Sequence, residues 1–213
     1  MRPINIHSGI VALLDCNDVD TDAILPKQFM MSVSRSGYGL HVFDEWKYLD
    51  PGTFGMDCSR RTLNPAFELN QPRYQGASIL LSRRNFGCGS SREHAVWGLA
   101  ECGFRIIVAE SFADIFRTNC INNGLLPIQL GPAEITHLVT AVKKKPGYRL
   151  ETWLEEQTIR TEEGILFRFS IPMADKTRLL RGYDAIEGSL LQRERIENFE
   201  KQRRERFPWL FGG

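Results

Sequence analysis

The sequence lacks any cysteine pattern that would hold a metal or a disulfide framework. No two of its five cysteines form a C-x-x-C pair, and their spacing is wide and irregular. An odd number at such spacing fits neither a disulfide-stapled domain nor a zinc or iron–sulfur site. We therefore expect mostly reduced thiols and no metal site on this chain. The cysteines are Cys16, Cys58, Cys88, Cys102 and Cys120.

The sequence also lacks a strong net charge and a long apolar run. Its formal charge is +1, so no basic field argues for nucleic acid or an anionic membrane. The longest apolar stretches, such as residues 9–14, are far shorter than the roughly 20 residues of a bilayer-spanning helix. The N-terminus has no signal-peptide pattern. We expect a cytoplasmic protein whose partners include neither nucleic acid nor membrane.

The hydrophobic pattern that is present predicts an α/β fold. Hydrophobic residues make up 42% of the 213 residues, enough for a substantial core. Apolar runs alternate with helix-period segments, an order typical of a layered α/β domain, and a hairpin is expected within residues 148–169. The expected strands are residues 4–14, 77–82, 105–109 and 125–130. The expected helices are one that ends near Cys102 and one with Phe112, Ile115 and Phe116 on one face.

No linker divides the chain, so we expect one domain over residues 1–213. Glycines and prolines punctuate residues 32–75, which predicts a long surface excursion with a mobile loop near residues 30–60. The mixed charges near residues 190–206 predict a solvated helix. The apolar Pro208-Trp209-Leu210-Phe211 beyond it either folds back on the domain or docks on another subunit.

The octapeptide Gly87-Cys88-Gly89-Ser90-Ser91-Arg92-Glu93-His94 is the strongest functional signal. It lies between an expected strand and an expected helix, where backbone N–H groups and the helix dipole favour negative charge. Two hydroxyls and a guanidinium around that point predict an anion site. The alternative is an ordinary capping box, with Ser90 and Glu93 closing the start of the helix.

Other motifs are incomplete. Asp18, Asp20 and Asp22 alternate like a calcium loop, but Ala23 and Phe29 replace its required glycine and glutamate, so a turn is the stronger interpretation. The glycine loop is neither a P-loop nor a dinucleotide fingerprint. No G-x-S-x-G elbow supports a serine hydrolase, although spacing alone leaves that hypothesis open.

Through the octapeptide and several further segments, the chain resembles the swivelling C-terminal domain of the aconitase superfamily. The resemblance covers most of residues 1–130 and also includes Ser111-Phe112-Ala113-Asp114 and Asn123-Gly124-Leu125. Residues 18–29 and 74–77 most resemble the small subunits of bacterial 3-isopropylmalate dehydratase. The resemblance implies a layered swivelling β/β/α fold. After about Pro172 the chain is expected to depart from these relatives.

The resemblance also implies a reaction and its residues. A large partner subunit would carry a [4Fe-4S] cluster, and this chain would close the site over a small diacid that is isomerised by dehydration and rehydration in leucine biosynthesis. Ser90 matches the serine that removes the carbon-bound proton. Ser91 and Arg92 match groups that bind the substrate carboxylate, Asp22 matches an active-site aspartate, and Arg35 falls near a second carboxylate-binding arginine.

Two other hypotheses remain open at this stage. A related hydratase of the citraconate or homoaconitate type would differ in the side chain of its diacid, which Phe29, Met30, Met31 and Val33 are positioned to contact unless they simply pack in the core. A non-catalytic anion-binding module would use the same helix start without turnover. Substrate identity and the partner lie beyond what spacing determines.

Overall fold

Strand β1 (Ile6–Leu13) organises the sheet, because its two halves pair with different partners. Its second half runs parallel to β2 (Ile79–Leu81), and its first half runs antiparallel to β5 (Arg149–Trp153). The computed structural model, which describes residues 1–31 and 35–211, thus has a seven-stranded sheet of order β4-β3-β2-β1-β5-β6-β7. The remaining strands are β3 (Ile106–Ala109), β4 (Leu126–Gln129), β6 (Thr158–Thr161) and β7 (Leu166–Arg168).

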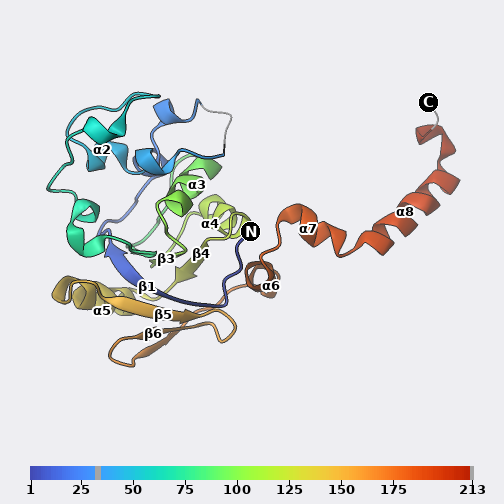
Figure 1. Ribbon diagram of the computed structural model, residues 1–213. Helices are drawn as coiled ribbons and strands as arrows, with labels where there is room; N and C mark the ends of the chain where they lie inside the picture. Colours follow the sequence, from blue (N-terminus) through green and yellow to red (C-terminus); the bar gives the residue numbers. More distant parts are fainter. Residues whose placement is uncertain (32–34, 212–213) are drawn as a thin grey trace.

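The parallel strands form the centre of the core. Every residue of β2 and β3 is buried, which explains why both read as continuous apolar runs. Figure 1 shows α3 and α4 above these strands and α5 below them. These helices are α3 (Glu93–Glu101), α4 (Asp114–Asn122) and α5 (Pro132–Lys144). The expected layered α/β class is confirmed.

One expected packing face is wrong. Helix α4 begins at Asp114, so Phe112 precedes the helix instead of belonging to it. Phe116 is buried, but Ile115 is 56% exposed. Consecutive helical residues point about 100° apart, so a helix that buries Phe116 turns Ile115 toward solvent.

Short helices fill the excursion between β1 and β2. They include α1 (Thr21–Ile24) and α2 (Asp44–Lys47), with several single 3-10 turns. Arg61 holds the segment together, because its guanidinium pairs with Asp44 and Asp50 while lying 3.8 Å from the ring centre of Tyr48. Mobility near residues 30–60 stays a prediction.

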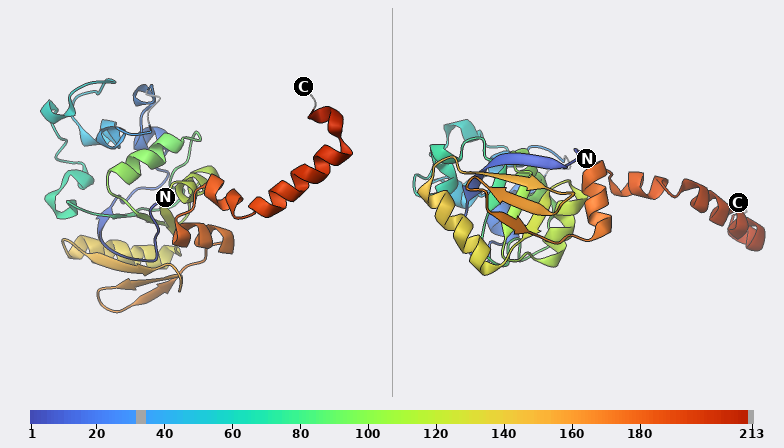
Figure 2. Two further views of the ribbon diagram at one scale, coloured as in Figure 1. Left: turned by 45° about the vertical axis from the view of Figure 1, so that its right-hand side comes forward. Right: turned by 90° about the horizontal axis from the view of Figure 1, so that it is seen from below.

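The C-terminal segment leaves the body of the protein. Helix α6 (Met173–Arg181) packs beside α4, and Gly182 then turns the chain with a φ of +72°. Beyond it α7 (Ala185–Leu190) and α8 (Arg193–Arg206) project outward, as both views of Figure 2 show. We call residues 185–211 the arm. Among the described residues, no helix is long and apolar enough to cross a bilayer.

Candidate active site

The glycine loop is clamped between two other segments at the carboxyl ends of the parallel strands. Phe86 bonds to residues 111 and 113, which follow β3, and the Gly87 amide donates to the Val19 carbonyl at 2.7 Å. Gly87 has a φ of +77°, and a Cβ there would lie 2.1 Å from the Phe116 ring. Only glycine fits this close approach without strain. The loop is therefore a fixed platform.

Ser90 and Ser91 are presented from this platform to solvent. Both are exposed, and neither hydroxyl bonds to any other residue that the structure describes. Helix α3 starts only at Glu93, with Arg92 as its N-cap and no side-chain capping bond. The capping-box interpretation of Ser90 is therefore wrong. The two hydroxyls remain available to a ligand.

Arg92 directly follows the two serines in the chain, and Asp22 neutralises its guanidinium. The Arg92 side chain is 6% exposed, while that of Asp22 is 48% exposed. Both terminal nitrogens of Arg92 donate to the Asp22 carboxylate, and the second of these bonds is 2.9 Å long. The fork geometry is the one that arginine also uses for substrate carboxylates. The structure thus brings Asp22, Ser90, Ser91 and Arg92 together.

Two positioning residues were missed by sequence reasoning. The Thr21 hydroxyl donates to the Ser90 carbonyl at 2.7 Å, and the Thr21 amide donates to the Cys88 carbonyl at 2.9 Å. These bonds join the acidic segment to the glycine loop. Asn123 bridges Glu93 and Trp97 across α3 and α4. The position of Thr21 between Asp20 and Asp22 was the available signal.

The other two aspartates of the acidic segment have different partners. Asp20 caps α1 by accepting from the Ala23 amide at 2.6 Å, and Asp18 accepts from the Asn85 side chain at 2.9 Å. The turn interpretation is confirmed for Asp20, whereas Asp18 and Asp22 bind the side chains of Asn85 and Arg92. Across residues 1–31 and 35–211, no group of three or more His, Cys, Asp or Glu residues is arranged to hold a metal ion.

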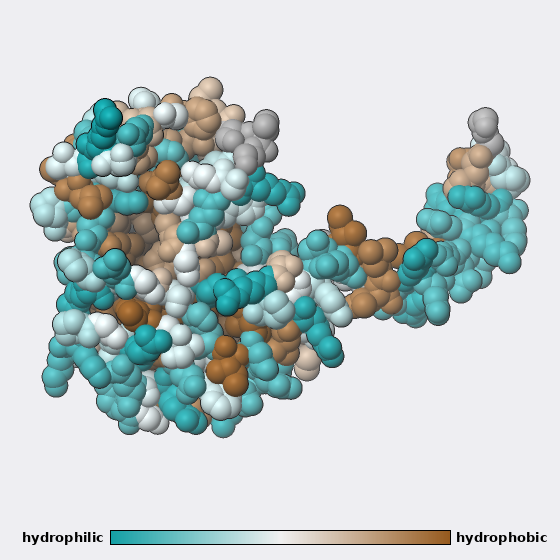
Figure 3. All heavy atoms as spheres, in the orientation of Figure 1, coloured by the Kyte–Doolittle hydropathy of each residue, from teal (hydrophilic) through white to brown (hydrophobic). Residues whose placement is uncertain are grey.

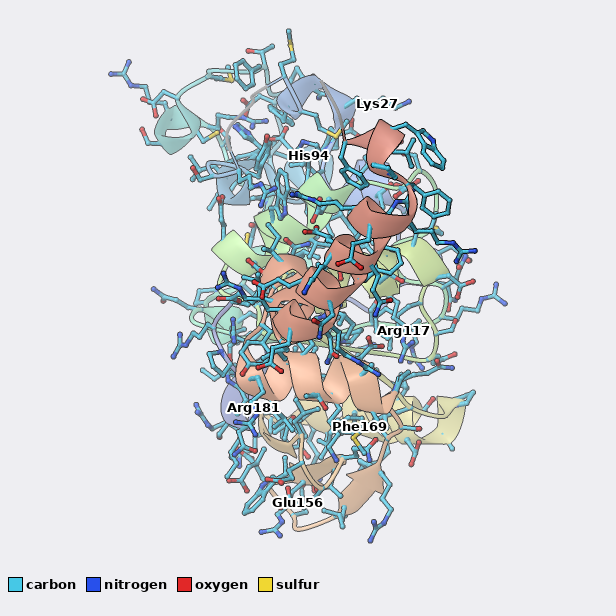
Figure 4. All side chains as sticks on the ribbon, turned by 90° about the vertical axis from the view of Figure 1, so that its right-hand side faces the viewer. Lys27, His94, Arg117, Glu156, Phe169 and Arg181 are labelled. Atoms are coloured by element: carbon cyan, nitrogen blue, oxygen red, sulfur yellow. The ribbon has the colours of Figure 1, made fainter. Side chains whose placement is uncertain are left out.

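Arg35 contacts Trp97 of α3, and not Ser90 or Ser91 on the glycine loop, the pair that we call the serine platform. Its guanidinium sits 5.5 Å from the Trp97 ring centre, and the Trp97 and His94 ring centres are 4.7 Å apart. Within the described chain, no hydrogen bond or ion pair joins Arg35 to Asp22 or to the two serines. In Figure 4, His94 lies in the same upper part of the molecule as Lys27, far from Phe169.

The residues expected to contact the substrate side chain differ in burial. Phe29 is 1% exposed and stacks on His41 at 4.0 Å, so the core-packing interpretation holds for it. Met30 is partly buried against the core, whereas Met31 is 76% exposed. Val33 lies outside the described residues.

All five cysteines are free thiols in the structure. Cys88, the one within the glycine loop, is not activated: burial, followed by the Asp20 and Asp18 carboxylates, raises the pKa of its thiol. A raised pKa disfavours the nucleophilic thiolate. Cys88 is therefore not an activated nucleophile.

Comparison with known proteins gives two family matches. The model of the aconitase C-terminal domain matches residues 1–133. A second model, which describes the C-terminal domain of the small subunit of 3-isopropylmalate dehydratase, matches residues 189–213. Together they include the glycine loop and most of the arm.

Curated relatives and a solved structure agree with these matches. The chain is 55% identical to proteins called 3-isopropylmalate dehydratase small subunit from Neisseria meningitidis serogroup A and from Neisseria gonorrhoeae, in each case over 100% of both chains. The crystal structure of a 3-isopropylmalate dehydratase from Methanocaldococcus jannaschii is 27% identical, with a TM-score of 0.62 over 92% of this chain and 99% of that one. The full-length matches overturn the expectation that the chain departs from its relatives after about Pro172.

Proposed function

This chain belongs to the family of 3-isopropylmalate dehydratase small subunits, and from that premise we propose that it is the small subunit of a hydro-lyase that interconverts 2-isopropylmalate and 3-isopropylmalate in leucine biosynthesis. The supporting observation is the serine platform. Two exposed hydroxyls with no internal partner among the described residues directly precede a buried arginine in the chain. This arrangement suits a dicarboxylate that must lose and regain a proton and a hydroxyl.

Ser90 is the catalytic residue of the proposal, acting at its Oγ as the base that takes the carbon-bound proton. A serine hydroxyl is a weak base in water, and each pKa unit of anion stabilisation corresponds to about 1.4 kcal/mol. The glycine-loop amides and the start of α3 are the local sources of positive potential. Closure by a partner would strengthen them by excluding water.

Ser91, Arg92, Asp22 and Arg35 are the substrate-binding residues of the proposal. In the free chain Asp22 occupies both terminal nitrogens of Arg92. A substrate carboxylate therefore reaches Arg92 by exchange with Asp22, and the half-exposed Asp22 is the partner that is free to turn away. Arg35 would have to leave its contact with the Trp97 ring, or extend from it, to reach the same ligand.

The partner of the proposal is a large subunit that carries the [4Fe-4S] cluster. The described residues of this chain do not fit such a cluster, because no group of metal-ligating side chains gathers among them. The ligands of the cluster would therefore have to come from the partner. The chain's own part is to bind the diacid and to hold and return the proton.

The arm supports assembly with that large subunit. Helix α8 buries none of its residues, and Trp209 is 71% exposed, so the apolar terminus does not fold back on the body. Figure 3 shows hydrophobic atoms gathered where the arm leaves the body, at Ile186, Leu190 and Leu191. Exposed apolar clusters of this kind mark protein interfaces. Free thiols at all five cysteines support a reducing, cytoplasmic location.

The decisive experiment combines this chain with an anaerobically reconstituted large subunit and follows alkene absorbance with 3-isopropylmalate and, separately, citraconate. We expect turnover of 3-isopropylmalate, and a loss of about 10²–10⁴-fold in Ser90→Ala with substrate binding retained. Ser170→Ala, the same change at an exposed serine before α6, should leave turnover intact.

Other outcomes would replace the proposal. Preferential turnover of citraconate would assign a related hydratase. Unchanged turnover in Ser90→Ala would remove the serine from its role. Labelling of the isolated chain by a phosphonylating reagent would favour a serine hydrolase. Binding without turnover in either mixture would leave only an anion-binding module.

A further inference from the structure

A polar cavity lies at the opposite end of the parallel strands from the serine platform. Its volume is about 100 Å³. By the same measure one water needs roughly 10–15 Å³, so the cavity has room for a small ion. It is formed where β1, β2 and β3 begin, because Ser78 and Arg105 directly precede the last two strands. The lining residues are Arg2, Pro3, Ile4, Ile6, His7 and Arg105.

Arg105 gives the cavity a half-buried positive charge. Its Nη2 donates to two backbone carbonyls, that of Arg2 at 2.8 Å and that of Pro3 at 3.4 Å. Those bonds orient the guanidinium but do not neutralise it. Burial and then the nearby Arg2 lower the pKa of Arg105, which shows that the two charges repel each other. The remaining N–H groups have no partner among the described residues.

His7 adds a titratable group to the same wall. Its Nε2 lies 2.8 Å from the Ser78 hydroxyl, which fixes the ring. Burial, followed by Arg105, Arg2 and Arg149, lowers the pKa of His7. The one carboxylate on the neighbouring strand β5 is that of Glu151, which lies opposite Ser8 in the strand register. Because Ser8 is adjacent to His7, Glu151 projects from the other face of the sheet and does not face the His7 ring.

Three other inward-facing arginines have a carboxylate partner, whereas the guanidinium groups of Arg105 and of the partly buried Arg73 donate only to backbone carbonyls among the described residues. Arg61 pairs with Asp44, Arg83 pairs with Asp15, and Arg92 pairs with Asp22. Within the described residues, Arg105 has no carboxylate partner. A partly desolvated charge without a counter-ion costs free energy, and an anion that enters from solvent removes that cost.

We propose that this cavity is a second anion site, which binds a small oxyanion with phosphate or carboxylate oxygens between Arg2, His7 and Arg105. The guanidinium N–H groups of Arg105 donate to the anion from inside, and the exposed Arg2 closes over it from outside. A protonated His7 adds a third donor, because the anion offsets the arginine repulsion that, after burial, lowers the pKa of the ring.

Nuclear magnetic resonance of the histidine rings in the full-length chain tests the site. The chain has four histidines, and His7→Gln identifies the His7 signal. We expect inorganic phosphate, and in a separate arm malate, to raise the pKa of His7, and the ligand with tighter binding identifies the source of the oxyanion. Arg105→Gln and the exposed-site variant Arg2→Gln should each weaken binding at least about tenfold. Arg168→Gln, the same change at an exposed position on β7, should leave binding unchanged.

Two results would overturn this proposal. The first is a His7 signal that responds to neither phosphate nor malate. The second is loss of affinity for the large subunit in Arg105→Gln with no anion effect on the free chain, which would assign these charges to the subunit interface. Because the readout is local to His7, binding at the serine platform does not imitate a positive result.

Discussion

Two arginines stand at opposite ends of the same parallel strands in opposite electrostatic states. Arg92 follows β2 at the carboxyl edge, deeply buried and held by the Asp22 carboxylate. Arg105 precedes β3 at the amino edge, half buried, and donates to backbone carbonyls. A neutralised arginine is stable as it is and exchanges its partner for substrate. An arginine without a counter-ion instead attracts an anion from solvent.

The largest expected effect concerns the paired arginine. Arg92→Lys keeps the charge but loses the planar fork that binds a carboxylate through two bonds. We expect turnover in the assembled enzyme to fall about a hundredfold or more. Arg83→Lys is the matched control, since Arg83 also pairs with an aspartate and is partly buried. Equal losses in both variants would mean that the role of Arg92 is merely structural.

The next effect tests how rigidly the carboxyl edge is held. Gly87→Ala places a methyl group against the Phe116 ring at a left-handed φ. We expect the free energy of unfolding in urea to fall by about 2–4 kcal/mol. Gly164→Ala, with a φ of +83° and nothing within 4 Å of its Cβ, should lose only about 1 kcal/mol. Similar losses in the two variants would show that the glycine loop rearranges to accommodate the methyl group.

A smaller effect is expected when Arg92 loses its counter-ion, which makes the carboxyl edge of the strands resemble the amino edge. Asp22→Asn keeps the shape of the side chain but removes the charge that neutralises Arg92. Because Asp22 is half exposed, we expect a loss of only about 1 kcal/mol in the free energy of unfolding. Added phosphate should restore it by occupying the vacated guanidinium. If phosphate does not raise the free energy of unfolding of this variant, the comparison between Arg92 and Arg105 fails.

The smallest effect is a pH dependence at the amino edge. Burial and the arginines hold the pKa of His7 below its ordinary value of 6.5. Below that value the unfolded chain binds more protons than the folded one, so this residue lowers stability as pH falls from 6.5 toward the folded pKa. Urea unfolding between about pH 5 and 8 should show a shallower slope in His7→Gln. Phosphate should flatten the slope of the unaltered chain, and an identical slope in His7→Gln would contradict the assignment.

Local patterns predicted the central fold well. Continuous apolar runs identified β2 and β3, because strands covered on both faces need no polar alternation. The start of α3 was placed less well. Ser90 and Glu93 have the spacing of a capping box, but bonds to Thr21 and Asn123 fix these residues differently. Contacts across the chain overrode the local preference.

The candidate site was likewise predicted only in part. The octapeptide marked Ser90, Ser91 and Arg92 as an anion site, and the family resemblance added Asp22 and Arg35. The roles of these residues in the reaction remain predictions. The pairing of Arg92 with Asp22, 70 positions apart in the chain, was not expected. Sequence spacing carries no record of which distant aspartate neutralises which arginine.

By itself the sequence determined the class of fold, the glycine loop and the membership in a family, because each depends on residues close together in the chain. The tertiary structure alone decided which charges are balanced. The return of β3 beside β2 brings Arg105 next to residues at the N-terminus, and folding supplies no carboxylate partner among the described residues. Charge balance depends on distances in space, which only the packed strands establish.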